Sequence, residues 1–355
     1  MRRTNGPQAV VTMQQVADRA NVSISTVSFV VNDTKPVSPD TRARILEAID
    51  ELGYRRNAAA RTLASRRSRV VALMYPFTEH HLSEFVTAAA TASAALGYRL
   101  ILWPTHGDDA ASEVTSLVKS GIADGALLME VKLEDERVAM LRDAHAPFVL
   151  MGRTRDTTGI DFVDVDFETT TAQAVAQLAE LGHRNVALVV EDNAGTPLAG
   201  HAPAARTEQT FLDEAAARGL GHYVARLPRG PAAGRELVDL LVRDAPDTTA
   251  VISLHNDANF GLVNTLRHRS VQVPRDLSIV AICAPETLGE LCDPPITTYP
   301  QPAEELGRQA AEALIARLHG SEGVIQQLIP CARPSSATSI ASAPRDRPPL
   351  GDEAQ

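Results

Sequence analysis

Residues 12–32 read TMQQVADRANVSISTVSFVVN, and they predict two short helices joined by a tight turn. Thr12 and Gln15 have the spacing of a capping box, in which each side chain bonds the backbone N–H of the other residue. Ser23 follows the turn and is suited to cap a second helix over about 24–32. Small and branched apolar residues recur every three or four positions, so each helix has one side to bury.

The stretch that follows, SPDTRARILEAIDELG over 38–53, predicts a third helix. Serine followed by proline is a favourable helix start, and Gly53 stands where helices commonly end. A third helix that braces two helices joined by a turn is typical of a helix-turn-helix. We expect its buried face to consist of Ile45, Leu46, Ile49 and Leu52.

The outer side of the second helix carries no charge. A helix that only supports a core normally presents charged residues to water. Hydroxyl groups can bond phosphates or base edges, and apolar groups can contact the methyl group of thymine. The pattern therefore favours a helix that reads DNA. The residues on this side are Ser23, Ile24, Ser25, Thr26, Ser28 and Phe29.

Charge is distributed unevenly along the chain. Residues 1–69 hold twelve Lys and Arg against six Asp and Glu, a formal charge of +6, whereas the remainder carries −16. A basic segment joined to an acidic body indicates that only the N-terminal part meets a polyanion. The alternative is a solvated basic tail, and charge alone does not decide between the two.

Several classes of protein are disfavoured. No apolar run approaches the ~20 residues that span a bilayer, so we expect no membrane partner. Met1-Arg2-Arg3-Thr4 is followed by no apolar segment, which predicts no signal peptide and a cytoplasmic protein. A DNA-reading helix would make this protein nucleoid-associated. Three cysteines without C-x-x-C spacing argue against disulfides and a zinc site. We expect no enzyme, no cofactor and no metal, because nucleophile and metal motifs are missing and the adjacent His80 and His81 diverge on a helix.

From residue 70 onward, apolar runs alternate with helical stretches. Continuous apolar runs between helices are typical of parallel strands covered on both faces. About eight such units exceed one compact sheet, so we expect two doubly wound α/β lobes with a ligand cleft beyond the carboxyl ends of the strands. The strand-like runs are 70–75, 99–103, 125–129, 148–151, 186–190, 250–254 and 277–283.

The N-terminal stretch resembles the signature of the lactose/galactose-repressor family of bacterial transcriptional regulators. Residues 12–32 carry the resemblance, and VSPDTR over 37–42 and LGYRRN over 52–57 continue it at the right spacing. The resemblance implies that Ile24, Ser25 and Phe29 face bases in the major groove. It also implies backbone contacts from Thr12, Ser23, Thr26, Ser28 and Asn32. Phe29 cannot donate a hydrogen bond, although several relatives have arginine or histidine there.

Residues 57–69 resemble the family's hinge helix and linker. In the family this helix orders on DNA beside its twin from a second subunit. Leu63 holds the position of the leucine that enters the minor groove, Ala60 permits close approach of the paired helices, and Asn57 begins the segment. An alanine-rich linker is the alternative reading, since a helix of nine residues is marginal alone.

The body also resembles the family, whose core is like a periplasmic sugar-binding protein. Gly152-Arg153, Leu181-Gly182-His183 and Asn256-Asp257 stand in family order. The resemblance implies a helix-turn-helix domain over 1–56 and an effector-binding and dimerisation core over 70–334. Its implied lobes are about 70–164 plus 296–330, and about 165–292. We expect a disordered tail over 335–355, from its Ser, Ala and Pro content.

Candidate effector contacts come from a family position for Arg206 and mostly from places at strand ends for the others, and each has a structural alternative. Arg206 matches an arginine that holds effector groups, or it is a surface residue. Asn256 and Asp257 follow a strand and offer polar groups to the effector; they can also cap the next helix, which does not exclude that contact. Tyr75 and Phe77 line the cleft, or pack in the core. Asp166 is a pocket acid or a helix cap.

The sequence departs from the family where AICAPE over 281–286 replaces a segment that usually carries an effector-binding aspartate. The implied function is a repressor that binds double-stranded operator DNA as a homodimer under control of a small effector, with a sugar as the family's default. The sequence leaves induction or co-repression open. The competing interpretation is a small-molecule-binding protein of periplasmic type without a DNA function.

Overall fold

The structure is a computed structural model that forms two compact units, Met1–Ser68 and Arg69–Gln355. We call the first unit the headpiece and the second the core. The predicted hinge residues Asn57, Ala60 and Leu63, and Phe77, lie outside the described residues, so the statements about them stay predictions. The structure describes residues 11–54, 67–76, 83–105, 110–336, 338–344 and 350.

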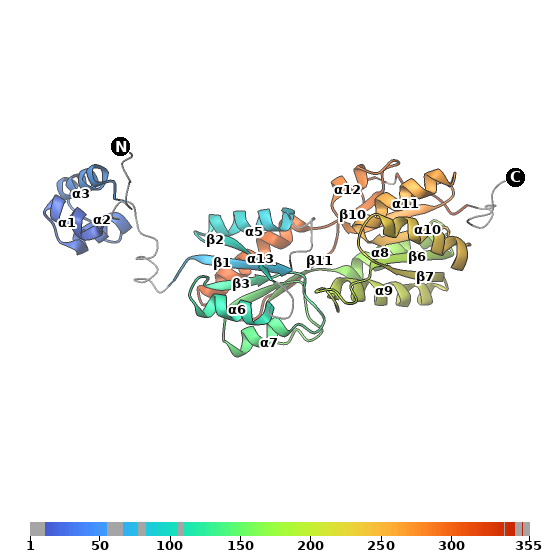
Figure 1. Cartoon of the computed structure of the whole chain (residues 1–355), viewed down its shortest axis with the longest axis horizontal. Coiled ribbons are helices and arrows are strands. Elements are labelled where there is room, and N and C mark those ends of the chain that lie inside the picture. Colours follow the sequence, from blue (N-terminus) through green and yellow to red (C-terminus); the bar gives the residue numbers. More distant parts are fainter. Residues whose placement is uncertain are drawn as a thin grey trace, which may run out of the picture. The chain divides into compact units, whose positions relative to one another are not determined.

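Within the described part of the headpiece, residues 11–54 form three helices, as the sequence predicts: α1 (Met13–Ala20), α2 (Ile24–Asn32) and α3 (Pro39–Leu52) (Figure 1). The predicted capping box is confirmed, because the Gln15 amide donates to Thr12 Oγ1 at 3.4 Å and the Thr12 amide donates to Gln15 Oε1 at 2.8 Å. The Gly53 cap is also confirmed, with a left-handed φ of 63° that glycine adopts without strain.

One side of each helix packs into the headpiece core. The expected burial of Leu46 is wrong, since this residue is 53% exposed, whereas Ile45 is fully buried. Neighbouring positions on a helix differ by about 100° in direction, so Ile45 and Ala48 occupy the inward side and Leu46 lies off it. The buried residues are Val16, Ala17, Ala20, Val27, Val30, Val31, Ile45 and Ala48.

The core begins with lobe one, a six-stranded parallel sheet in the order β11-β5-β4-β3-β1-β2. Helices α5 and α13 pack on one face of the sheet, and α6 and α7 cover the other (Figure 1). The strands are β1 (Val70–Pro76), β2 (Arg99–Thr105), β3 (Gly125–Leu128), β4 (Phe148–Met151), β5 (Phe162–Val165) and β11 (Gln326–Ile329). The helices are α5 (Ser83–Ala95), α6 (Ala110–Lys119), α7 (Glu136–Asp143) and α13 (Ala303–Leu318).

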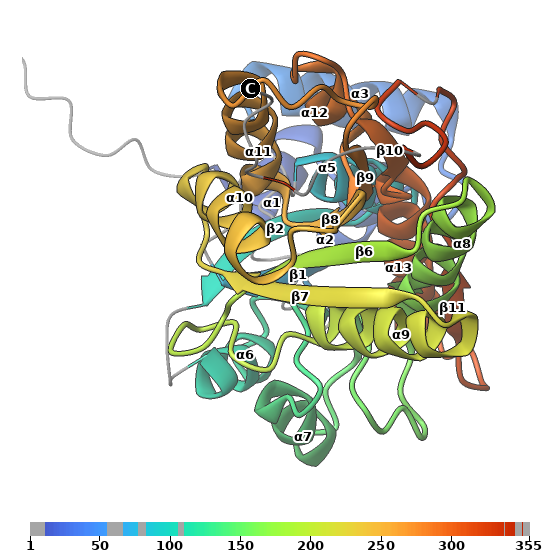
Figure 2. The ribbon, with the colours of Figure 1, turned by 90° about the vertical axis from the view of Figure 1, so that its right-hand side faces the viewer.

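Lobe two is a five-stranded parallel sheet in the order β10-β9-β8-β6-β7. Figure 2 shows its two helix pairs, α8 with α9 and α10 with α11, on opposite faces. The strands are β6 (Asn185–Glu191), β7 (Gly221–Leu227), β8 (Ala250–Leu254), β9 (Ser278–Ala284) and β10 (Thr297–Pro300). The helices are α8 (Phe167–Glu180), α9 (Ala202–Arg218), α10 (Ala232–Asp244), α11 (Asn256–His268) and α12 (Glu286–Glu290).

The chain passes between the lobes after β5, after β10 and after β11. The expected start of the second lobe-one segment at 296 is wrong, because Thr297 pairs with Val280 of β9 in the sheet of lobe two. The return to lobe one therefore follows Pro300 and leads into α13. None of the helices described is long and apolar enough to cross a membrane.

The predicted disorder from residue 335 is wrong for the segment 338–344. Ser339 is fully buried, its hydroxyl donates to the Ile279 carbonyl at 2.5 Å, and it accepts from the Thr297 amide at 2.7 Å. The Ile279 amide in turn donates to the Ser339 carbonyl at 2.8 Å. Polar bonds of this kind hold the segment against β9 and β10, so its low apolar content does not prevent it from folding.

Candidate functional site

The headpiece presents the outer side of α2 as a candidate DNA-reading surface. Ile24 is 46% exposed, Ser25 is exposed, and Phe29 is half-buried. Val27, Val30 and Val31 hold the opposite side in the core. The burial pattern thus leaves the residues expected to read bases on one accessible side of the helix.

The hydroxyl groups expected to contact the DNA backbone lie mainly at helix starts. Ser23 caps α2, accepting from the Thr26 amide at 3.2 Å, and lies 2.7 Å from Ser25 Oγ and 2.8 Å from Thr26 Oγ1. Thr12 caps α1 in the same way. The free N–H groups of a helix start favour phosphate. Ser28 is half-buried on α2, where Asn32 is the last residue.

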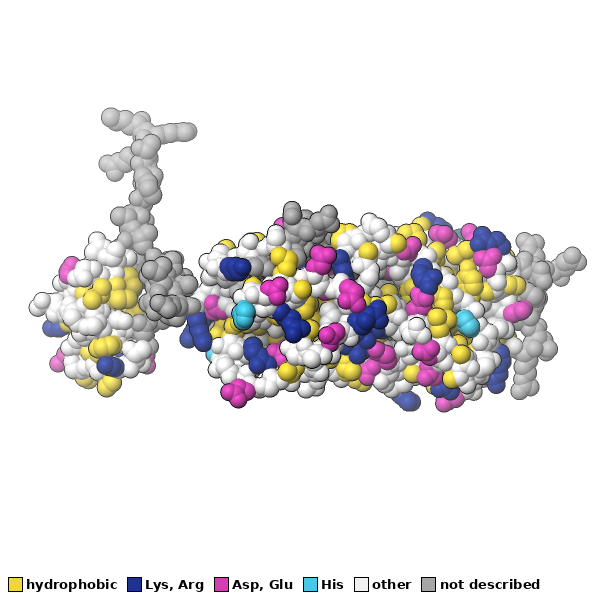
Figure 3. All heavy atoms as spheres, turned by 90° about the horizontal axis from the view of Figure 1, so that it is seen from below, with side chains coloured by type: hydrophobic (Ala, Val, Ile, Leu, Met, Phe, Trp, Pro, Cys, Tyr) yellow, Lys and Arg dark blue, Asp and Glu magenta, His cyan; other side chains and the backbone are white. Residues whose placement is uncertain are grey.

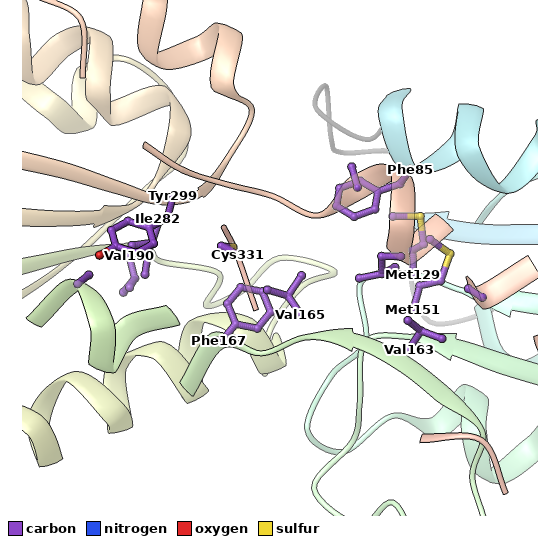
Figure 4. Close-up of a cluster of buried hydrophobic side chains, with 14 of the residues drawn as sticks. Phe85, Met129, Met151, Val163, Val165, Phe167, Val190, Ile282, Tyr299 and Cys331 are labelled. Atoms are coloured by element: carbon purple, nitrogen blue, oxygen red, sulfur yellow. The ribbon is translucent and has the colours of Figure 1, made fainter. Parts of the chain in front are cut away.

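The core contains a cavity of about 160 Å³ between the lobes. Figure 4 shows Phe85, Met129 and Met151 grouped in lobe one, with Val165 and Phe167 where the chain passes into lobe two. The wall combines these apolar groups with polar groups that converge from both lobes, as small-molecule sites do. The polar lining residues are Glu130, Asp164, Glu191, Asn193, His201, Asn256, Cys283 and Gln301.

Three carboxylates line the cavity, and each pairs with a basic group: Glu130 with His201, Asp164 with Arg153 and Glu191 with Arg229. Glu130 pairs with His201 at 3.0 Å; burial raises its pKa, but His201, Arg229 and Arg137 outweigh burial and lower it. Burial raises the pKa of Asp164 to about 6, although the ion pair with Arg153 at 2.9 Å opposes the shift. Carboxylate oxygens held in this way remain able to accept further hydrogen bonds from a ligand.

A short backbone bridge closes one side of this cavity. The Leu133 amide donates to the Gly200 carbonyl at 2.9 Å, and the Ala202 amide donates to the Val131 carbonyl at 3.1 Å. These bonds join lobe one to lobe two beside the Glu130–His201 pair. Opening of the cavity on this side would break these bonds.

The predicted effector residues are not all brought to the cavity. Asn256 lines it, whereas Tyr75, Asp166 and Asp257 are not among its lining residues in the part of the chain that the structure describes. Tyr75 is buried in the hydrophobic core. Asp166 caps α8, accepting from the Thr169 amide at 2.8 Å. The cap of α11 is His255, not Asn256.

Arg206 lies on α9 behind the cavity lining. Its Nη1 donates to Glu168 Oε1 at 3.1 Å, and its Nη2 donates to the Thr154 carbonyl at 2.9 Å. Glu168 also pairs with Arg153, which holds Asp164. The arginine therefore joins α9 of lobe two to the segment after β4 of lobe one and supports the Asp164 side of the wall.

Sequence reasoning missed most of the polar wall. Glu130 follows β3 by two residues, and Glu191 is the last residue of β6. Ligands of α/β sheets bind beyond the carboxyl ends of strands, so these positions were the available signal. Asn193 and His201 lie on the loop between β6 and α9, and Phe85 lies in an apolar helix, where nothing in the sequence marks them.

Comparison with known proteins identifies both units. The family model "Bacterial regulatory proteins, lacI family" matches residues 12–57. The family model "Periplasmic binding protein-like domain" matches residues 175–336. The DNA-binding match covers the three headpiece helices, which contradicts the alternative of a binding protein whose N-terminal part serves no DNA function.

Curated relatives span nearly the whole chain. The HTH-type transcriptional regulator CelR of Thermobifida fusca is 32% identical over 321 residues, covering 87% of this chain and 92% of its own length. Catabolite control protein A of Priestia megaterium is 29% identical over 311 residues, covering 86% and 91%. The first is named as a transcriptional regulator and the second as a control protein.

Solved structures agree in fold. A CelR–cellobiose complex has a TM-score of 0.66 at 26% identity, covering 92% of this chain and 100% of that chain. The lac repressor dimer bound to operator and the anti-inducer ONPF has a TM-score of 0.83 at 22% identity, covering 94% and 100%. The second likeness concerns the fold alone.

Proposed function

The chain belongs to the lacI family of bacterial regulatory proteins, and we propose that it represses transcription by binding a pseudo-palindromic operator as a homodimer under the control of a small effector. The observation that carries the proposal is the pairing, in one chain, of a three-helix headpiece with an uncharged outward helix and a core with a polar interlobe cavity. Two identical headpieces suit two half-sites about one helical turn apart.

The headpiece supplies the DNA contacts in this account. Ile24, Ser25 and Phe29 read base edges, while the hydroxyls of Ser23, Thr26 and Ser28, with Thr12 and Asn32, contact phosphates. Leu63, Ala60 and Asn57 form the hinge that enters the minor groove. The acidic core stays off the DNA. On the face of the core in Figure 3, basic and acidic side chains are intermixed rather than gathered by sign.

The cavity is the effector site in this account, and its chemistry supports a polyhydroxylated ligand such as a sugar. The three carboxylates accept hydrogen bonds, Asn256 can donate and accept, and Asn193 Nδ2 is a buried donor that lacks a partner among the described residues. Hydroxyl groups both donate and accept, so a sugar can satisfy all of these groups. No Lys or Arg is among the lining residues described, which disfavours an anionic ligand.

Control follows from the two-lobe arrangement. An effector that binds one lobe arrangement better than another shifts the balance between them. A bound operator must then change effector affinity by the same factor as the effector changes operator affinity. We place Arg206 in this coupling, as a brace between the lobes. The protein acts at the nucleoid.

Selection of bound double-stranded DNA from a random pool, followed by a metabolite screen for release, tests the proposal. We expect enrichment of a pseudo-palindrome and release or tightening by a sugar. A pool that shows no enrichment after repeated rounds would contradict the DNA function. Enrichment without any metabolite effect would contradict the effector function alone.

A further inference from the structure

The residues of α2 expected to read bases offer few hydrogen-bond donors. Ile24 and Phe29 offer no hydrogen bond, and Ser25 offers one small hydroxyl. Guanine presents two acceptors, N7 and O6, in the major groove, and its commonest protein partners are Arg and Lys. The structure places a cation at this surface: the ammonium group of Lys35 lies 5.0 Å from the centre of the Phe29 ring.

The turn after α2 creates this contact. Asp33 adopts a left-handed conformation with φ 52°, and its amide donates to the Phe29 carbonyl. The Thr34 amide donates to the same carbonyl at 3.2 Å. The chain therefore folds back beside Phe29, and Lys35 follows one residue later. Arg42 Nη1 donates to Asp33 Oδ1 at 3.0 Å, which ties the turn to α3.

Lys35 differs from two other basic residues of the headpiece, Arg19 and Arg42, which are engaged in ion pairs. Arg19 pairs with Glu51 at 2.5 Å, and Arg42 pairs with Asp33. Lys35 is exposed, and among the described residues its one recorded partner is the Phe29 ring. An aromatic face attracts a cation without neutralising it, so the charge stays available to another partner.

We propose that Lys35 reads a guanine in each operator half-site and that Phe29 is the residue that positions it. The flexible lysine stem loses conformational freedom when it binds, and the ring reduces that loss by holding the ammonium group in advance. Lys35 thus supplies the hydrogen-bond donor that the Phe29 side chain lacks, and the Phe29 ring holds it in place. The inference rests on the proposed function, because it requires α2 to face the major groove.

The test compares the DNA motifs that full-length variants select from a random pool. Lys35→Met removes the charge and keeps the length of the side chain. Phe29→Leu removes the ring and keeps the apolar contact, and Phe29→Trp restores a ring. We expect Lys35→Met and Phe29→Leu to lose the same guanine preference, on the order of 5- to 150-fold at one position per half-site, and Phe29→Trp to retain it.

Arg44→Met is the matched control, since Arg44 is an exposed basic residue of α3. It should leave the motif unchanged. Phe29 is half-buried, so a thermal melt of each variant must show that the headpiece is folded. If Phe29→Leu is unfolded, the motifs selected by Lys35→Met and Lys35→Arg are compared instead. We then expect Lys35→Arg to keep the guanine preference and Lys35→Met to lose it. This arm depends on the exposed lysine alone.

Three results would overturn the inference. Lys35→Met could leave the selected motif unchanged and lower the slope of log K against log salt concentration by about 1. That result would mean that Lys35 contacts a DNA phosphate and not a base. A guanine preference that Lys35→Met loses but Phe29→Leu keeps would mean that the ring does not position the lysine. The same loss in Arg44→Met would mean a general charge effect. A wild-type chain that selects no motif would instead overturn the proposed function.

Discussion

Replacement of Arg206 by alanine tests the interlobe brace most directly. The change removes the bond from Nη2 to the Thr154 carbonyl and the bond from Nη1 to Glu168. Thr154 is buried, so we assign its bond about 1.5–3 kcal/mol, whereas Glu168 is 39% exposed and its pair contributes about 0–1 kcal/mol. Arg206 Nε is buried without a recorded partner, and its removal relieves part of this loss. We expect a net destabilisation of about 2 kcal/mol.

Urea unfolding, followed by the fluorescence of Trp103, measures this change. Trp103 is the single tryptophan and lies in β2 of lobe one, so its signal reports a lobe that does not contain Arg206. Arg218→Ala is the matched control on the same helix, since its pair with Glu214 has i,i+4 spacing and contributes about 0.3–0.5 kcal/mol. Equal unfolding midpoints in the two variants would refute the brace.

Four further predictions concern the reading surface, the cavity, pH and the C-terminal segment. Ile24→Ala should relax base preference at one position per half-site by roughly 1–3 kcal/mol, and a selected motif identical to wild type would remove Ile24 from base reading. Asn193→Ala should weaken binding of the metabolite found by screening by about 5- to 150-fold in calorimetry, because it removes a buried donor, while Asn264→Ala on the exposed side of α11 should not. The pKa of Asp164 is raised from 3.8 to about 6, so the folded state holds more protons than the unfolded state between these pH values. The free energy of unfolding should therefore fall as pH rises through that window. Asp164→Asn should remove this pH dependence, and thermal melts with parallel pH profiles in both proteins would argue against it. Ser339→Ala should cost about 1–3 kcal/mol in urea unfolding because it leaves the Thr297 amide without its acceptor, whereas the exposed Ser335→Ala should change little.

The headpiece could be predicted closely because local chemistry determines it. Capping side chains, the turn and the apolar stripe all act within a few residues, and they fixed the three helices. Leu46 was the exception. The helical spacing of apolar residues does not show which of two adjacent apolar positions, Ile45 or Leu46, is buried.

Apolar runs predicted the strands β1, β2, β3, β4, β6, β8 and β9, but not β5, β7, β10 or β11. β7 (Gly221–Leu227) and β11 (Gln326–Ile329) are edge strands with exposed residues, so they lack a continuous apolar pattern. The segment 338–344 was missed for a related reason, because polar bonds to β9 and β10 hold it. Composition reports apolar burial and carries no information about such bonds.

The position of the cavity could be predicted from the sequence, but most of the side chains that line it could not. Strand ends indicate where a ligand sits, and Asn256 was found in this way. Arg206 was expected to touch the effector, yet the structure directs it to Glu168 and Thr154, groups 38 and 52 residues away in the chain. Partners so distant depend on the packing of the two lobes.

The central claim is that the full-length protein distinguishes one DNA sequence from others. Fluorescence anisotropy at one salt concentration can compare its affinity for the selected operator with that for a scrambled duplex of equal length and composition. We expect an affinity ratio on the order of 10³ or more in favour of the operator. A ratio near 1 would mean that the headpiece binds DNA only by charge, and it would contradict the assignment of α2 as a base-reading helix.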